Sequence, residues 1–596
     1  MTKKTVSELL DLAHKSEEYR DRYFKHRALR NIRWYNGDYG NYPTNGHNSN
    51  LDTSYFYYVN LVYSTSRTIL SSIYSRFPEF SFFLQGDLTK SIRESSGVDI
   101  KFQTEKLERV LEAITKVYFK EMKVRRTNRK SILDMILTGY GVTKMGYNVD
   151  FDKEKKDLLE QNLGIPEDKF VELASNIEVS ELVKRSEPYT LRVHPMNMLF
   201  PIEAEDFNRL GWQIEIIYKD LDEVEKMYGV KGKLSATYQP SYLDDDQRSH
   251  KEAANVVKLY EYHSLDPADP RIMVFAEGYD KFLEDKPHPL FEEDSSKVTN
   301  MYQYVWVNES YKSIYPQSDI DLIEPQIREA TFQTQKRVDH VRKWVSQLII
   351  QGVIDDSEKM KLIHGDDGAY IYLMNTDARI SVVERANLSS DFYNNIVSIR
   401  NEIFETLGLT DYSVGGSTEK RKATEAQLIE RSRIDRVQQR VDDIEEFSYE
   451  QVDCFVEIMK EYEQVGRMFN IELGDERLAM FFAGELLKMS DLQIQVVPGS
   501  TVSLDREAEI RRFERLSQFL VNANTAQPGL VKTGKWFKDG LNKLGYAGGE
   551  YINEDVAPPQ AVDPNQLSKV PGVPNQPGVP TPTPQELGNQ PNLKVV

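Results

Sequence analysis

The chain has 596 residues, which is too long for one ordinary hydrophobic core, so several modules are expected. Hydrophobic residues make up 40% and aromatic residues 11%, a composition typical of a folded globular protein and not of a disordered chain. The formal net charge of −19 argues against a conventional DNA-binding protein, because proteins that grip nucleic acid by its phosphates are usually basic.

Membrane insertion and a disulfide framework are not expected. The most apolar stretch, Tyr55 to Leu84, is interrupted by polar residues and by Pro78 and is too broken to span a bilayer. The first residues lead into an acidic, polar helix, so no signal peptide is expected. The single cysteine, Cys454, is typical of a reducing compartment, and we expect synthesis in a cytoplasm.

The N-terminal part of the chain has helical periodicity. Apolar residues at spacings of three and four predict helices over 1–36, 60–77 and 97–138, the last as one helix or two. Pro78 is expected to stop the second helix, and Gly139 to cap the third.

The middle of the chain changes to short β-type runs separated by turn-forming residues. Several alternate, as in Trp212-Gln213-Ile214-Glu215-Ile216. The predicted strands are 142–149, 189–193, 212–218, 256–262, 272–275 and 302–307. Together they predict an antiparallel β-rich module over 140–315, with a helix at 220–228 behind a capping box of Asp220 and Glu223.

The most regular helix is predicted at 324–348, with Pro325 in its first turn. Its apolar positions form a narrow seam suited to packing against a neighbouring helix. The seam consists of Ile327, Ala330, Thr334, Val338, Val341, Val345 and Leu348.

Beyond this helix, the pattern predicts a hairpin over 361–374, whose turn is Gly365-Asp366-Asp367-Gly368. A helix at 391–407, a glycine-containing loop at 408–418 and a long helix at 424–465 follow. A strand at 492–497 and a helix at 505–522 complete the folded part. The residues from Ala557 onward are rich in proline and are expected to be disordered or extended.

Enzyme signatures are absent from the sequence. There is no phosphate-binding Gly-x-x-x-x-Gly-Lys-Ser/Thr loop, no His-Glu-x-x-His and no Cys-x-x-Cys. A metal site at His364-Gly365-Asp366-Asp367 is conceivable, but a hairpin turn accounts for the same residues without a ligand. We therefore expect neither a catalytic site nor a metal or other cofactor.

Several blocks of sequence, in order, resemble the portal proteins of tailed bacteriophages, the head-to-tail connectors. The blocks span about residues 29–520, and the ordered set is more specific than any one of them. They are 29–37 (LRNIRWYNG), 60–64 (NLVYS) with Arg67 and Pro78, 138–147 (TGYGVTKMGY), Tyr315-Pro316 with 322–326 (LIEPQ), and 406–411 (TLGLTD) with Gly415-Gly416 and 422–426 (KATEA). The proline-rich C-terminal segment departs from the family pattern, because it gives no sign of a long helical barrel.

The resemblance implies an α+β, portal-like architecture. Residues 1–320 correspond to the wing, with its β-rich part at 140–315, and residues 321–348 and 391–408 to the two stem helices. The clip would be a small α/β module at 349–390, and the tunnel loop would cover 409–423. The remaining parts are a long wing helix with a return strand at 424–499, a small crown at 500–555 and a disordered proline-rich tail at 556–596.

The resemblance also implies function, partners and sites. Portal proteins are ring-forming structural conduits for genome packaging, retention and ejection and for joining head to tail, so a dodecamer in the virion, assembled in the host cytoplasm, is expected. The expected partners are double-stranded DNA passing through without sequence readout, a terminase motor, neck or adaptor proteins, and major capsid and scaffolding proteins. Candidate site residues are Gly415, Gly416, Lys420, Arg421 and Lys422 for DNA in the channel, Ile327, Val338, Val341 and Val345 for the stem interface, and Gly365, Asp366, Asp367 and Gly368 in the clip.

Two other functions stay open at this point. One is a non-enzymatic helical adaptor or scaffold, which the long helices alone would permit. The other is an enzyme of the packaging machinery, which would need a nucleotide-binding loop that the sequence does not contain.

Overall fold

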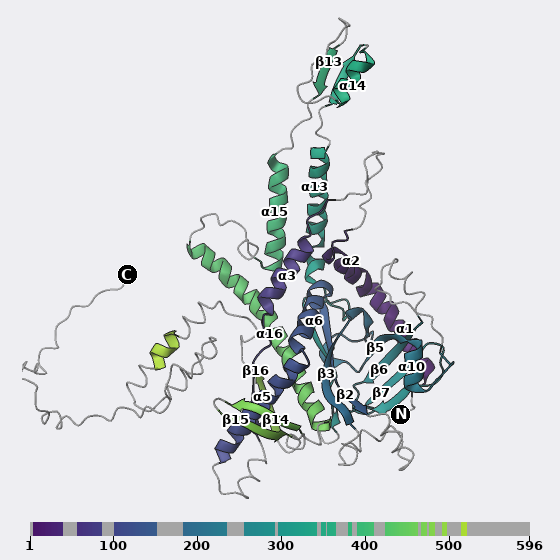
Figure 1. The fold of residues 1–596 in the computed structure, drawn as a ribbon, viewed down its shortest axis with the longest axis vertical. Helices are drawn as coiled ribbons and strands as arrows, with labels where there is room; N and C mark the ends of the chain where they lie inside the picture. The colour runs from purple at the N-terminus through teal and green to yellow at the C-terminus, as the bar shows by residue number, and fades with distance from the viewer. Residues whose placement is uncertain are drawn as a thin grey trace, which may run out of the picture. The chain divides into compact units, whose positions relative to one another are not determined.

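The structure is a computed structural model, and it contains helices together with antiparallel sheets, an α+β composition (Figure 1). It divides into two units, Met1–Ser503 and Leu504–Val596. The residues that it describes are 4–39, 57–85, 100–151, 183–234, 255–292, 296–342, 347–352, 354–364, 379–383, 390–409, 423–462, 467–473, 476–482, 491–496 and 514–520. In the second unit, residues 514–520 are helical, within the helix predicted at 505–522, and the proline-rich tail lies outside the described residues.

The N-terminal segment is helical, as predicted. Helix α1 (Val6–Arg20) continues through a π-helical turn (Asp21–Lys25) into α2 (His26–Tyr35). A capping box starts α1: the Thr5 hydroxyl accepts from the Glu8 N–H, and the Glu8 carboxylate accepts from the Thr5 N–H. These bonds satisfy two of the donors that a helix start leaves unpaired.

Three more helices precede the sheets. Helix α3 (Leu61–Ile73) begins behind Asn60, whose side chain accepts from the Tyr63 N–H, and it ends four residues before the predicted stop at Phe77. The segment predicted as one helix or two is two, α5 (Ile100–Glu121) and α6 (Val124–Thr138), separated by Lys123 at a φ of 57°. Gly139 caps α6 at a φ of 104°, a backbone conformation that favours glycine, as expected.

The predicted β-rich module is confirmed, and it consists mainly of two antiparallel sheets. The smaller has the strand order β11-β2-β3, and the larger β4-β5-β6-β7-β8. The strands are β2 (Tyr140–Phe151), β3 (Val183–Val193), β4 (Met198–Leu199), β5 (Trp212–Asp220), β6 (Val256–Ser264), β7 (Arg271–Ala276), β8 (Glu284–Pro287) and β11 (Tyr302–Trp306), and a short pair, β9 (Phe291–Glu292) and β10 (Lys297–Val298), lies beside them in sequence. Helix α10 (Leu221–Tyr228) is capped by Asp220, whose carboxylate accepts from the Asp222 N–H and not from Glu223 as predicted.

A buried ionic cluster links the two sheets. Lys144 on β2 donates to Glu215 on β5 at 2.9 Å and to Glu261 on β6 at 2.8 Å. The Tyr302 hydroxyl donates to the same Glu215 carboxylate at 2.7 Å, and His263 contacts Glu261 at 2.8 Å. Burial alone would raise the pKa of Glu261, but Lys144 and His263 lower it, so its carboxylate stays ionised.

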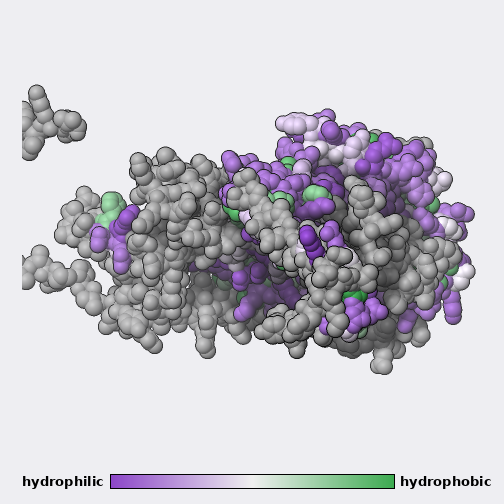
Figure 2. All heavy atoms as spheres, turned by 90° about the horizontal axis from the view of Figure 1, so that it is seen from above, coloured by the Kyte–Doolittle hydropathy of each residue, from purple (hydrophilic) through white to green (hydrophobic). Residues whose placement is uncertain are grey.

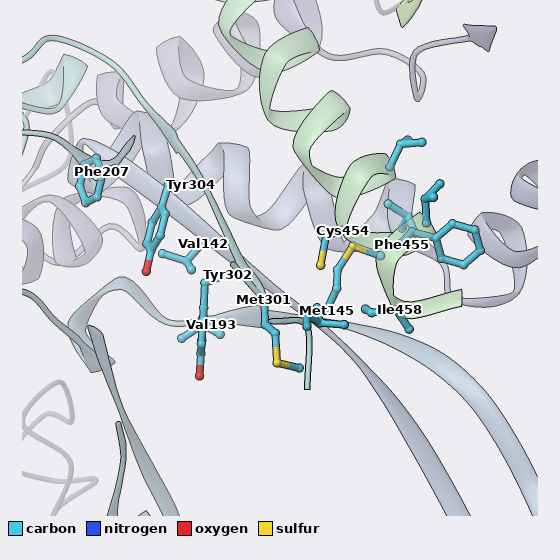
Figure 3. Close-up of a cluster of buried hydrophobic side chains, with 14 of the residues drawn as sticks. Val142, Met145, Val193, Phe207, Met301, Tyr302, Tyr304, Cys454, Phe455 and Ile458 are labelled. Atoms are coloured by element: carbon cyan, nitrogen blue, oxygen red, sulfur yellow. The ribbon is translucent and has the colours of Figure 1, made fainter. Parts of the chain in front are cut away.

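The long helix α16 (Ala423–Tyr462) passes through the core, as the apolar periodicity of 424–465 predicts. Its buried residues, among them Cys454, Phe455 and Ile458, lie in one cluster with Met145 of β2 and with Met301, the residue before β11 (Figure 3). The predicted strand at 492–497 is confirmed as β16 (Asp491–Val496), which pairs with β1 (Phe80–Gln85), a strand that we did not predict. A hairpin of β14 (Arg467–Leu473) and β15 (Glu476–Phe482) was also missed.

In the sequence, the β-rich module is followed by a pair of helices separated by a small α/β insert, and α16 comes after them. Helix α12 (Asp319–Leu322) leads into α13 (Glu324–Arg342), and α15 (Ser390–Leu407) returns, close to the predicted 391–407. The insert contains β12 (Gln347–Gln351), α14 (Asp356–His364) and β13 (Arg379–Val383), with β12 and β13 antiparallel.

Two predictions were wrong here. The helix predicted over 324–348 ends at Arg342, and Leu348 lies in β12 opposite Val382. Residues 361–363, predicted as the first arm of a hairpin, lie in α14. The predicted turn itself, Gly365-Asp366-Asp367-Gly368, lies outside the described residues.

Candidate functional site

The candidate site is the pair of helices α13 and α15, which pack against each other. Their bases are buried in the core that they share with α3, α6 and α16. Ile327 and Ala330 of α13 and Ile399, Ile403 and Leu407 of α15 are all buried there. Because these residues recur at spacings of three and four, each helix presents one apolar stripe to the core.

A polar network fixes where α13 begins. Ser318 and Asp321 form a capping box at the start of α12. The Asp321 carboxylate also accepts from Arg27 at 2.9 Å and from Arg30 at 2.6 Å, and Arg30 pairs with Glu324 in the first turn of α13. The helix pair is thereby fastened to α2 by charge-assisted bonds, which are stronger and more directional than bonds between neutral groups.

A second ion pair ties the same region to α16. Both oxygens of the fully buried Asp319 carboxylate accept from Arg440, each at 2.8 Å. Asn308 donates to the same carboxylate at 3.1 Å. This two-bonded geometry holds the Asp319 and Arg440 side chains in one orientation, so the start of the helix pair and the long helix are positioned together.

The two helices carry exposed apolar side chains. The exposed fractions are 49% for Phe332, 61% for Val341, 46% for Tyr393 and 56% for Val397. From Gln335 to Val341 in α13, and from Phe392 to Ser398 in α15, no residue is buried. In both helices, the half that lies away from the core thus carries apolar side chains with little packing inside the chain. Such a surface favours burial against another molecule.

The structure separates the predicted interface residues. Ile327 is buried within the chain, Val338 is half-buried and Val341 is exposed. Val345 lies outside the described residues, as do the predicted DNA-facing residues Gly415, Gly416, Lys420, Arg421 and Lys422. In the described part of the chain, the predicted seam is thus buried in the core at its beginning, whereas Val338 is only half-buried and Val341 is exposed.

A strongly basic surface was missed by the sequence analysis. Seven cations crowd into residues 116–130 around the junction of α5 and α6, and all seven are exposed. They are Lys116, Lys120, Lys123, Arg125, Arg126, Arg129 and Lys130. A run with seven cations and one acid, Glu121, in a chain of net charge −19 is the signal that would have found it.

Most of the described surface is hydrophilic on the face drawn in Figure 2, with apolar residues scattered singly. Among the described residues no group of three or more His, Cys, Asp or Glu side chains could hold a metal ion. No helix in that part of the chain is long and apolar enough to cross a membrane. The one cysteine, Cys454, is a buried free thiol, and burial raises its pKa.

Comparisons with known proteins give no assignment: no protein-family model matches the sequence, and no curated protein matches it significantly.

Proposed function

We propose that the protein is the subunit of a ring-forming conduit, the portal of a tailed bacteriophage, through which double-stranded DNA enters and leaves a capsid. The observation that carries the proposal is the helix pair α13 and α15. Its base is fixed in the core, and exposed apolar residues such as Phe332, Val341 and Val397 follow further along. In a single chain these apolar side chains stay exposed to water. A ring of repeated helix pairs would bury them between neighbouring copies.

The order of elements supports the same proposal. Two stem helices, α13 and α15, flank a small α/β insert made of β12, α14 and β13. A portal has this arrangement of stem, clip and stem, with the β-rich wing before it and a long wing helix after it. In the proposed function the insert docks a terminase motor and later a neck protein, and the wing contacts capsid and scaffolding proteins.

The anchoring network suits a conduit that bears load. Asp321 and Asp319 tie the start of the stem to α2 and to α16 through Arg27, Arg30 and Arg440. The Asp319 side chain is fully buried and the Asp321 side chain nearly so, and breaking either pair would leave a buried charge uncompensated. Force applied to the stem would then be passed to the wing.

Negative-stain microscopy of the purified full-length chain tests the proposal. The portal function predicts rings with a central hole. Rods or single chains would favour the helical adaptor or scaffold instead. An enzyme of the packaging machinery would be favoured by nucleotide turnover that a substitution in this chain abolishes.

The contact with DNA is proposed to be made by the basic triplet Lys420, Arg421 and Lys422, next to Gly415 and Gly416. In a ring every subunit would bring this triplet to the channel, where it could touch phosphates without reading sequence. Replacing all three with Gln should leave rings intact but reduce packaged or retained DNA. Normal packaging and retention by intact mutant rings would remove the triplet from the mechanism.

A further inference from the structure

An apolar pocket opens beside the basic surface of α5 and α6. It has a cavity volume of about 300 Å³ and lies between the segment Phe77–Phe82, α5 and the start of α6. Four phenylalanines, Phe77, Phe80, Phe82 and Phe119, line it. An apolar cavity of about 150 Å³ is enough for a benzene ring, so this pocket has room for an aromatic side chain.

Cations surround the pocket on one side. Lys116, Lys120 and Arg125 are among its lining residues and are exposed, and two carboxylates, Glu79 and Glu112, line it as well. Arg125 donates to the backbone oxygen of Ser75, and the structure shows no ion pair for any of the three with the described residues. An apolar pocket whose lining holds more cations than carboxylates favours an aromatic side chain that is flanked by carboxylates.

The chain carries that combination on α16. Tyr449 is 38% exposed; Glu446, three residues before it, is exposed, and Glu450, one residue after it, is half-buried. Neither glutamate has an ion-pair partner among the described residues. Burial and the neighbouring Glu446 and Asp453 carboxylates raise the pKa of Glu450 to about 7, and Lys297 pairs with Asp453 on the same side of the helix at 3.4 Å.

We propose that Tyr449 and its flanking glutamates on one copy of this chain dock into the phenylalanine-lined pocket and its cationic rim on a second copy. This inference rests on the proposed ring assembly and names the contact between wings. None of the residues that line the pocket comes from α16, so the two surfaces are different parts of one chain. Two different complementary surfaces make a head-to-tail contact, which closes into a ring when the rotation between copies allows it.

Double-stranded DNA is an alternative ligand that the seven cations of this surface could bind. A phosphate backbone would neutralise Lys116 and Lys120, but it has no apolar group to fill a pocket lined by Phe80, Phe82 and Phe119. The acidic face with its exposed Tyr449 matches both features of the site, because the ring can fill the apolar pocket and the carboxylates can pair with the cations. DNA binding is therefore an outcome that the test has to separate.

Charge exchange in the full-length chain tests the contact. One variant carries Lys116→Glu with Lys120→Glu, a second carries Glu446→Lys with Glu450→Lys, and a third carries all four substitutions. Each two-site variant should weaken assembly, followed by mass photometry over a dilution series, by roughly tenfold per reversed charge. The four-site variant should recover most of the loss, because opposite charges face each other again.

Two further variants complete the design. Tyr449→Ala removes the aromatic anchor and should also weaken assembly. The pair Lys226→Glu and Glu223→Lys changes exposed charges on α10 and should not alter assembly. Circular dichroism and thermal unfolding of every variant separate loss of contact from loss of fold.

Several results would overturn the inference. Folded two-site variants that assemble like the wild type, or a four-site variant without recovery, would exclude the contact while leaving the proposed ring standing. A Lys116/Lys120 variant that assembles normally but loses affinity for a 30-base-pair DNA duplex would assign the surface to nucleic acid. A wild-type chain that stays single at every concentration would instead contradict the proposed function itself.

Discussion

A charge at Val341 tests whether the upper half of the helix pair is an interface. Val341 exposes 61% of its surface in the single chain. Fully burying a valine contributes on the order of 2 kcal/mol, so an interface can gain about 1 kcal/mol from this side chain. Val341→Asp would lose that gain and place a carboxylate against apolar surface, at a total cost of about 3 kcal/mol. That cost corresponds to roughly a hundredfold weaker association between neighbouring copies.

The same change should hardly alter the stability of the single chain, because an exposed substitution alters the free energy of unfolding by about 0.5 kcal/mol or less. Ile327→Asp is the opposite case: Ile327 is 1% exposed, so the carboxylate would be buried and the chain should lose several kcal/mol of stability. Asn401→Asp, on an exposed position of α15, adds the same charge and should affect neither property.

Assembly would be measured by mass photometry over a dilution series, and the free energy of unfolding by urea denaturation of the dissociated chain. The reasoning is refuted if Val341→Asp assembles as well as Asn401→Asp. It is also refuted if Val341→Asp unfolds the chain as Ile327→Asp is expected to, because then the side chain would be buried within one copy.

Three other predictions concern the β-rich module and the proline-rich segment. Lys144→Met should cost about 3–5 kcal/mol in the free energy of unfolding, because it leaves Glu215 and Glu261 buried without their cation; a loss under about 1 kcal/mol would contradict this. Burial, with His263 and Lys286 nearby, lowers the pKa of His288 to about 3, so the unfolded chain takes up a proton below about pH 6.5 while the folded chain does not. The stability that the neutral imidazole contributes is thus present above that pH and lost below it. In urea titrations at pH 7 and pH 5, His288→Asn should reduce the acid loss by about 2 kcal/mol, and an unchanged loss would exclude His288 as its source. Deleting residues 557–596 should leave assembly intact, since the segment is rich in proline and poor in apolar side chains; dissociation into single chains on light scattering would contradict it.

The elements that the sequence predicted well are those with a strong period. The strand at 212–218 alternates apolar and polar residues, and the long helix repeats apolar residues at three and four over many turns, so both were found with nearly correct ends. The helix cap predicted at Gly139 is also confirmed, since Gly139 caps α6 in the left-handed conformation.

The misses have physical causes. The run Gln347-Leu348-Ile349-Ile350 extends the apolar spacing of α13, and a short apolar run fits a helix or a buried strand equally well. The strand that contains it, β12, pairs with Arg379–Val383 at separations of 28 to 36 positions along the chain, and no local pattern reports such a pairing. The same holds for β1, whose partner β16 lies about four hundred residues further along the chain.

The candidate site was predictable only in outline. The apolar seam was visible, but the spacing could not tell that Ile327 is covered by the chain's own core while Val341 stays exposed. The basic run over 116–130 was visible in the sequence and was overlooked because the overall charge is acidic. Its relation to a phenylalanine-lined pocket required the fold, because Phe77 to Phe82 and α5 are adjacent only in space.

Native mass spectrometry of the purified full-length chain tests the central claim most directly. A conduit built from repeated helix pairs predicts one closed assembly, whose mass is a single integer multiple of 69.0 kDa and does not grow with concentration. A single chain, or a ladder of masses that lengthens as the concentration rises, would contradict it.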